Sequence, residues 1–145
     1  MTPHIRNFVF DDIDDVVDLM AQLGYPTSAE VMQNRMKILT SLPDYRTFIA
    51  ELDGKAVGLI GVCKRVLYES DDVPVQIAAL VTHSQYRGAG IGRALVQAAE
   101  KWALEAGAHS LFLTSGIKPE RTKAHEFYQN LGFDITRYRF VKKLE

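Results

Sequence analysis

The chain has 145 residues, of which 47% are hydrophobic, and its formal net charge is -1 at neutral pH. This supplies one well-buried domain over residues 1–145, and the near-neutral charge disfavours nucleic acid as the main partner. Cys63 is the single cysteine, which excludes an internal disulfide and a cysteine-rich metal site. We therefore expect no bound metal. We also expect no membrane partner and a cytoplasmic location, because the sequence shows no leader or membrane-spanning run.

The first third of the chain predicts one strand and two amphipathic helices. Residues 4–10 fit a short strand, and the helical apolar spacing that follows ends at Gly24. Thr27 and Glu30 form a capping-box pattern that predicts the start of a second helix. That helix should end before Pro43, since proline biases the residue before it away from helical angles.

A hairpin is predicted next, with its turn at Asp53-Gly54. Its two strands lie within residues 45–68. Gly58 and Gly61 interrupt the second strand, and such glycines mark a bulge or a close approach of another backbone. Residues 69–72 read as an acidic, solvated connection.

An apolar strand over residues 75–82 leads into Arg87-Gly88-Ala89-Gly90-Ile91-Gly92-Arg93, which opens a helix. Glycine at every second position leaves backbone N–H groups uncovered, so that several can point at one anion where the helix begins. The two arginines add positive charge. This pattern is typical of a phosphate or pyrophosphate cradle, although a plain strand-to-helix turn is the alternative.

The remainder alternates again between helix and strand. The helix after the glycine loop should end at Gly107, with a buried stripe of Ile91, Ala94, Leu95, Ala98 and Trp102. A strand over residues 109–114 follows, then a helix after Pro119 that Gly132 caps. Residues 133–141 read as one or two terminal strands. The whole is an α/β chain without linker or repeat.

Two segments resemble the signatures of the GCN5-related N-acetyltransferase (GNAT) superfamily. The stretch from Arg87 to Gly92 is similar to its glycine-loop motif. The run from Ala124 to Phe133, with an aromatic-tyrosine pair before Leu-Gly-Phe, is similar to its second motif. The order of predicted elements fits over nearly the whole chain. The resemblance implies a mixed, mostly antiparallel central sheet flanked by helices, with a splayed strand pair forming the acetyl-CoA cleft.

The resemblance also implies acetyl-CoA as the co-substrate and assigns residues to it. The pantetheine arm would lie along Leu80, Val81 and Thr82, with a backbone N–H near Val81 facing the thioester oxygen. The pyrophosphate would lie on the loop formed by Arg87, Gly88, Ala89, Gly90, Ile91, Gly92 and Arg93. Tyr128 resembles the family's tyrosine acid, which protonates the departing thiolate. Its alternative is a packing aromatic.

The base is not assigned, because the sequence departs from the family pattern at three positions. Gln76 stands where many relatives have a glutamate, Arg121 where many have an asparagine, and Gly116 where some have a carboxylate. A water chain and an amine captured already neutral both remain open. The residues at which such a chain could end are Glu69, His83 and Glu126.

The residues do not identify the acceptor, although they exclude other uses of the loop. Arg93 stands where a nicotinamide-binding loop needs glycine, and no Gly-Lys-Ser/Thr follows. A small primary amine, such as an aminoglycoside or a polyamine, is the leading expectation. A protein lysine or N-terminus, or a noncatalytic acyl-CoA-binding module, are the alternatives. The segment 11–42 and the loop after Tyr68 would set the choice, and the family resemblance implies a homodimer.

Overall fold

The computed structural model describes residues 2–115 and 119–144, and the chain divides into two compact units. The first is Met1–Leu111 and the second Phe112–Glu145. Gly116, one of the positions at which the sequence departs from the family pattern, lies outside the described residues.

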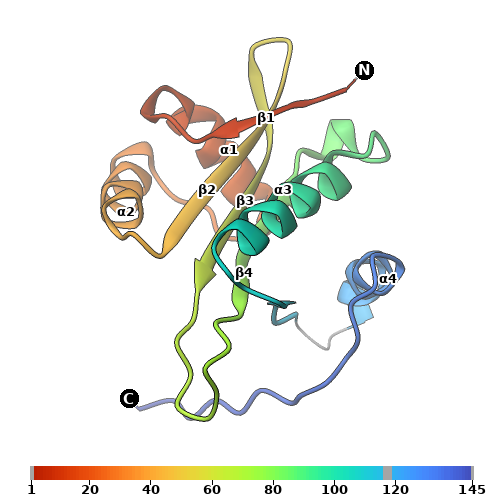
Figure 1. Ribbon diagram of the computed structural model, residues 1–145. Helices are drawn as coiled ribbons and strands as arrows, with labels where there is room; N and C mark the ends of the chain where they lie inside the picture. Colours follow the sequence, from red (N-terminus) through yellow and green to blue (C-terminus); the bar gives the residue numbers. More distant parts are fainter. Residues whose placement is uncertain (1, 116–118, 145) are drawn as a thin grey trace. The chain divides into compact units, whose positions relative to one another are not determined.

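A five-stranded sheet in the order β1-β2-β3-β4-β5 forms the centre of the first unit (Figure 1). The first four strands pair antiparallel with their neighbours. They are β1 (His4–Asn7), β2 (Tyr45–Leu52), β3 (Lys55–Lys64) and β4 (Val75–Thr82), and β5 (Leu111–Phe112) follows beside β4. The predicted mixed, mostly antiparallel sheet is confirmed.

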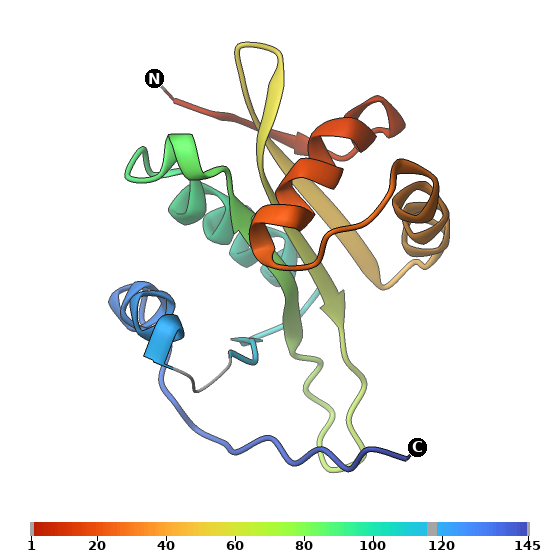
Figure 2. The ribbon, with the colours of Figure 1, turned by 180° about the vertical axis from the view of Figure 1, so that it is seen from behind.

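Helices cover both faces of this sheet, as the two opposite views show (Figures 1 and 2). On one face α1 (Ile13–Leu23) and α2 (Ala29–Ser41) pack with Ile49 and Leu59 in a single apolar core. On the other lies α3 (Ile91–Glu105). Its buried residues follow a ridge of every fourth position, from Ile91 and Leu95 through Ala99 to Ala103, with Val96 beside them. The predicted Ala94, Ala98 and Trp102 are only half-buried.

The hairpin turn is confirmed, while two other boundaries differ from the prediction. Asp53 and Gly54 adopt φ of 51° and 76°, which is the two-residue turn that suits twisted strands. Ser28, not Thr27, caps α2, because its Oγ accepts from the Val31 N–H at 3.1 Å while its own backbone is extended. Adjacent Ser and Thr offer the same hydroxyl, so the sequence could not choose between them. β3 also stops at Lys64, short of Tyr68.

The second unit contains α4 (Thr122–Asn130), preceded by a 3₁₀ turn over Pro119–Arg121. The predicted strand over residues 109–114 is reduced to β5, and the predicted strands over residues 133–141 are wrong, because these residues adopt no regular structure. Apolar periodicity marks a face that can be buried, but a strand also needs a partner backbone to bond with.

Candidate functional site

The glycine loop leads into α3 with an open, uncapped helix start. Gly88 and Gly90 adopt φ of +83° and +78°, and a Cβ at either position would meet nothing within 4 Å. Gly90 occupies the N-cap without a side-chain hydrogen bond, and the first intrahelical bond runs from the Ala94 N–H to the Gly90 carbonyl at 3.0 Å. The helix start thus has no side-chain cap, and the open surroundings of Gly88 and Gly90 leave room for an anion beside it.

Hydrogen bonds from α1 hold the chain that enters this loop. His83 is buried, with Nε2 3.2 Å from an Asp18 carboxylate oxygen, and its Nδ1 accepts from the Gln85 N–H at 3.2 Å. The Ser84 N–H donates to the Gln22 side-chain oxygen at 2.7 Å. Since both ring nitrogens of His83 are engaged, we read it as a fixed link between α1 and the loop, not as an available base.

Gly58 allows the start of α3 to lie close to the sheet. A Cβ at Gly58 would stand 2.8 Å from Ile91 Cγ2 and 3.0 Å from Leu95 Cδ1, so any larger residue would displace the helix or its side chains. The sequence predicted a bulge or a close approach of another backbone at this glycine, whereas the structure shows a close approach of side chains from α3.

The other glycine of β3 marks a bulge in β4. Gly61 pairs with Ala79 and Val62 pairs with Ile77, which leaves Ala78 as an extra, exposed residue. Such a residue leaves backbone groups outside the ladder and bends the strand. Beyond the bulge Leu80, Val81 and Thr82 return to register opposite Ile60, Leu59 and Gly58. Sequence reasoning missed Ala78, although Gly61 was the available signal.

A cavity of about 700 Å³ opens beside this bulge, on the face of the sheet that α1 and α2 cover. Its walls come from the end of α1 and the loop after it, from α2, and from β2, β3 and β4, where Ala78 and Ala79 take part. Most of the lining is apolar, and its two charged residues are Arg35 and Arg46. A cavity of this size suits a small organic ligand.

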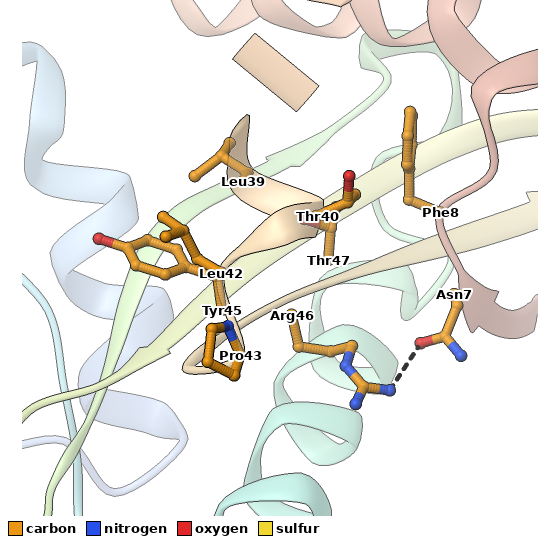
Figure 3. Close-up of a pocket in the computed structure, with 9 residues that line it drawn as sticks. All are labelled: Asn7, Phe8, Leu39, Thr40, Leu42, Pro43, Tyr45, Arg46 and Thr47. Carbon is orange, nitrogen blue, oxygen red and sulfur yellow. Dashed lines mark hydrogen bonds between the residues drawn. The ribbon is translucent and has the colours of Figure 1, made fainter. Parts of the chain in front are cut away.

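Arg46 also borders a smaller cavity of about 280 Å³ at the edge of the sheet (Figure 3). There its guanidinium turns away from the Tyr45 ring and donates to the Asn7 side-chain oxygen at 3.4 Å. Tyr45 and Thr47 lie on the opposite face of β2, since side chains alternate along a strand.

Tyr128 lies on α4 in the second unit, within an aromatic cluster. Its ring meets the rings of Phe127 and Phe133 edge-on, with centroids 5.4 and 5.8 Å away. The N–H of Phe133 donates to the Tyr128 carbonyl at 3.1 Å and that of Gly132 to the Gln129 carbonyl at 3.0 Å. Gly132 has a φ of +93°. This is a Schellman cap, so the Leu-Gly-Phe part of the second motif orients the tyrosine ring.

Burial raises the pKa of the Tyr128 hydroxyl, and the nearby charge of Arg121 opposes part of that rise. The hydroxyl therefore keeps its proton at neutral pH. Tyr128 and the loop residues from Arg87 to Arg93 belong to different units, each described by itself.

Gln76 is already engaged and cannot serve as a base. Its side-chain oxygen accepts from Arg65 Nε at 2.9 Å and from Arg65 Nη2 at 2.6 Å, at the start of the long loop between β3 and β4. In residues 2–115 and 119–144 no three His, Cys, Asp or Glu side chains gather as a metal group. Nor does any helix there have the length and apolar character to cross a membrane.

Comparison with known families gives a match over residues 13–133 to the model of the "Acetyltransferase (GNAT) family". In sequence the chain is similar to an uncharacterized N-acetyltransferase of Methanocaldococcus jannaschii, with 30% identity over 137 residues. That alignment covers 90% of this chain, which spans 60% of the relative's length. An aminoalkylphosphonate N-acetyltransferase of Salmonella typhimurium is 29% identical over 142 residues, covering 97% of this chain and 90% of that protein.

Among solved structures the chain is similar to a GNAT family acetyltransferase of Staphylococcus aureus. The TM-score is 0.85 at 28% sequence identity, and the match covers 99% of this chain and 100% of the other. The second unit is thus included in the likeness, since the matched region extends past Leu111.

Proposed function

The chain belongs to the GNAT family of acetyltransferases, and from this premise we propose that it transfers the acetyl group of acetyl-CoA to a small primary amine. The observation that carries the proposal is the uncapped start of α3, which follows two glycines with positive φ. The strand that leads into this loop, β4, also borders the 700 Å³ cavity. One end of β4 thus leads to an anion site, and its bulge faces a cavity for an organic ligand.

The loop residues fit the pyrophosphate of acetyl-CoA. The N–H groups at the start of α3 would bind its oxygens, with the helix dipole and the exposed Arg87 and Arg93 adding positive potential. The open space beyond Gly88 and Gly90 fits the requirement that no Cβ stand between amide and phosphate. Leu80, Val81 and Thr82 would bond the pantetheine arm through their backbone.

In the reaction the amine nitrogen bonds to the acetyl carbon and loses one proton, while the carbon–sulfur bond breaks and the sulfur gains one proton. Acetyl-CoA supplies the thioester for this exchange. The bulge at Ala78 offers backbone N–H groups outside the ladder that could face the carbonyl oxygen. We therefore propose a donor near Ala78, whereas the sequence led us to expect one near Val81.

Tyr128 is the proposed proton donor, through its Oη–H. With reference pKa values of about 10 for tyrosine and 8.5 for a thiol, the transfer is uphill by about 2 kcal/mol, and the raised pKa of Tyr128 adds to this cost. No base is assigned. An amine captured neutral needs no base before it attacks, and the proton that its nitrogen loses after attack goes to water or to the phenolate left on Tyr128. This agrees with the engaged state of both His83 and Gln76.

Two observations support a small-molecule acceptor over a protein. The cavity has the volume that a small organic ligand fills. One relative is named for acetylating aminoalkylphosphonates, which are small amines. We further propose that residues 1–145 act as one catalytic domain, because the family match from 13 to 133 extends over both units. A cytoplasmic location and a homodimer stay predictions.

The test is coenzyme A release in the presence of a panel of amines and of lysine peptides, together with calorimetry of acetyl-CoA binding. We expect binding and turnover of at least one small amine. Turnover of lysine peptides and of no small amine would show that the acceptor is a protein and not a small molecule. Binding without any turnover would favour the noncatalytic acyl-CoA module.

A further inference from the structure

We propose that the acceptor carries an anionic group that pairs with Arg35, attached to an apolar body that fills the 700 Å³ cavity. The proposal rests on the proposed function, because it concerns the acceptor of the same reaction. It narrows a small primary amine to an amino acid or aminophosphonate type of amine, and it removes the polycationic amines that the sequence had left open.

The charge of the cavity lining carries the first step. Among the described residues that line it none is acidic, and the charged ones are Arg35 and Arg46. A polyamine or aminoglycoside brings several positive charges, which need carboxylates around them once they leave water. This cavity would instead repel them.

Arg35 is the cation that remains available to a ligand. The Arg46 guanidinium is turned toward Asn7 and donates to its side-chain oxygen at 3.4 Å (Figure 3). Within residues 2–115 and 119–144 Arg35 forms no ion pair. Its neighbours one turn away on α2 are apolar: Val31, Met32, Ile38 and Leu39.

The rest of the lining describes the body of the acceptor. Met20, Met32 and Met36 share the cavity with leucines and with the small side chains of the β4 bulge. Methionine is polarisable and adapts its shape, so such a wall favours an apolar group without demanding one outline. A planar guanidinium at its border binds carboxylate and phosphonate alike through paired N–H groups.

The test compares acceptors that share one body. Phenylalanine and 1-amino-2-phenylethylphosphonate carry the anion, 2-phenylethylamine lacks it, and spermidine is the polycation. We expect kcat/KM of the parent to be at least about tenfold higher for one of the two anionic amines than for 2-phenylethylamine, with spermidine lowest. The two anionic arms distinguish carboxylate from phosphonate.

Variants of Arg35 and of a control residue on the same helix test which side chain causes the preference for an anionic amine. Arg35→Gln should lower kcat/KM for the better anionic amine about 10- to 100-fold, mainly through KM, and leave 2-phenylethylamine unchanged. Arg35→Lys should restore part of the loss. Lys37→Gln is the matched control, because it removes a positive charge from the same helix outside the lining of the cavity, and it should leave the preference intact. A parent that prefers 2-phenylethylamine or spermidine, or an Arg35→Gln variant that keeps the full preference, would overturn the proposal.

A binding measurement separates this proposal from the proposed function. Calorimetry in the presence of coenzyme A, which needs no turnover, should show an affinity for N-acetylphenylalanine that Arg35→Gln loses and Lys37→Gln keeps. Binding with this pattern and no turnover of any amine would refute the acetyl transfer while supporting the anion site. Turnover without this pattern would refute the anion site alone.

Discussion

The glycine loop of residues 87–93 and the 700 Å³ cavity adjoin the same strand, yet they are built in opposite ways. The loop consists of consecutive residues that present backbone N–H groups, with glycines where φ is positive. The cavity takes its walls from segments spread between Met20 and Ala79, and it presents side chains. One site is therefore local in the sequence, while the other depends on segments that are distant in the sequence.

The largest effect should come from placing a negative charge in the loop. Gly90→Glu adds a carboxylate to an open space at the helix start, where we expect acetyl-CoA affinity to fall on the order of 10²-fold or more by calorimetry. Gly107→Glu is the matched control, with a φ of +84° and the same open surroundings at the other end of α3. Both variants carry the same backbone strain. Equal affinities for acetyl-CoA in the two folded variants would contradict the placement of the pyrophosphate at Gly90.

Tyr128→Phe should follow, because it removes one hydroxyl and keeps the ring among Phe127 and Phe133. We expect kcat to fall by about 10²-fold, the low end for acid catalysis, with folding and acetyl-CoA affinity retained. Since burial raises the pKa of Tyr128 above its usual value near 10, the acid is lost only at higher pH. The parent should thus keep its advantage through pH 9.

A smaller loss, near tenfold, is still compatible, because a thiolate leaves fairly well without a proton. The decisive readout is the pH profile under conditions where chemistry limits the rate. A variant that turns over its best amine at the parent rate across that profile would assign Tyr128 to packing alone.

The same contrast explains what the sequence could predict. Some features depend only on neighbouring residues, and the sequence predicts them. They are the positive φ at Gly88 and Gly90, the Asp53-Gly54 turn and the cap at Gly132. Other features depend on which distant segments meet, so the spacing of residues in the sequence does not predict them. Examples are the position of Arg35 at a cavity and the contact between Asp18 and His83. The failed strands over residues 133–141 belong to the same class, since a strand depends on its partner. The bulge lies between, because Gly61 indicated a bulge but not which residue of β4 it would displace.

The two glycines of β3 offer a structural version of the comparison. Gly58→Ala places its Cβ 2.8 Å from Ile91 Cγ2, a branched methyl that cannot swing aside, so we expect a loss of about 1–3 kcal/mol in the free energy of unfolding. Gly58→Ala should also weaken acetyl-CoA binding, because Ile91 is the first residue of α3, whose N-terminus is the proposed pyrophosphate site.

Gly61→Ala is the matched control on the same strand. Its Cβ would lie 3.9 Å from Ala79 Cβ, an ordinary contact, and alanine suits a strand better than glycine by about 0.5–1 kcal/mol. Urea unfolding of both variants measures the difference. Equal stabilities would show that α3 can move away from the sheet at little cost.

An effect of similar size concerns Asp12 and Arg6, which hold the chain just before α1, the helix that links the two regions. Asp12 accepts from both terminal nitrogens of Arg6 at 2.8 and 2.9 Å and from the Val9 N–H at 2.9 Å, and Arg6 also bonds Glu51 at 2.7 Å. Burial works against the charged form of Asp12, but these hydrogen bonds prevail and hold its pKa below the usual value.

A carboxyl group with a lowered pKa in the folded state stabilises the protein above its unfolded pKa, near 3.9, and this contribution disappears as the pH falls through the folded value. Asp12→Asn should therefore lower the free energy of unfolding by about 1–3 kcal/mol at pH 7. The deficit relative to the parent should shrink steadily below pH 4. Urea titrations of both proteins between pH 7 and pH 3 measure this. A deficit that stays constant over the range would mean that Asp12 acts through its shape and its neutral hydrogen bonds, and that the charge of Arg6 is held by Glu51 alone.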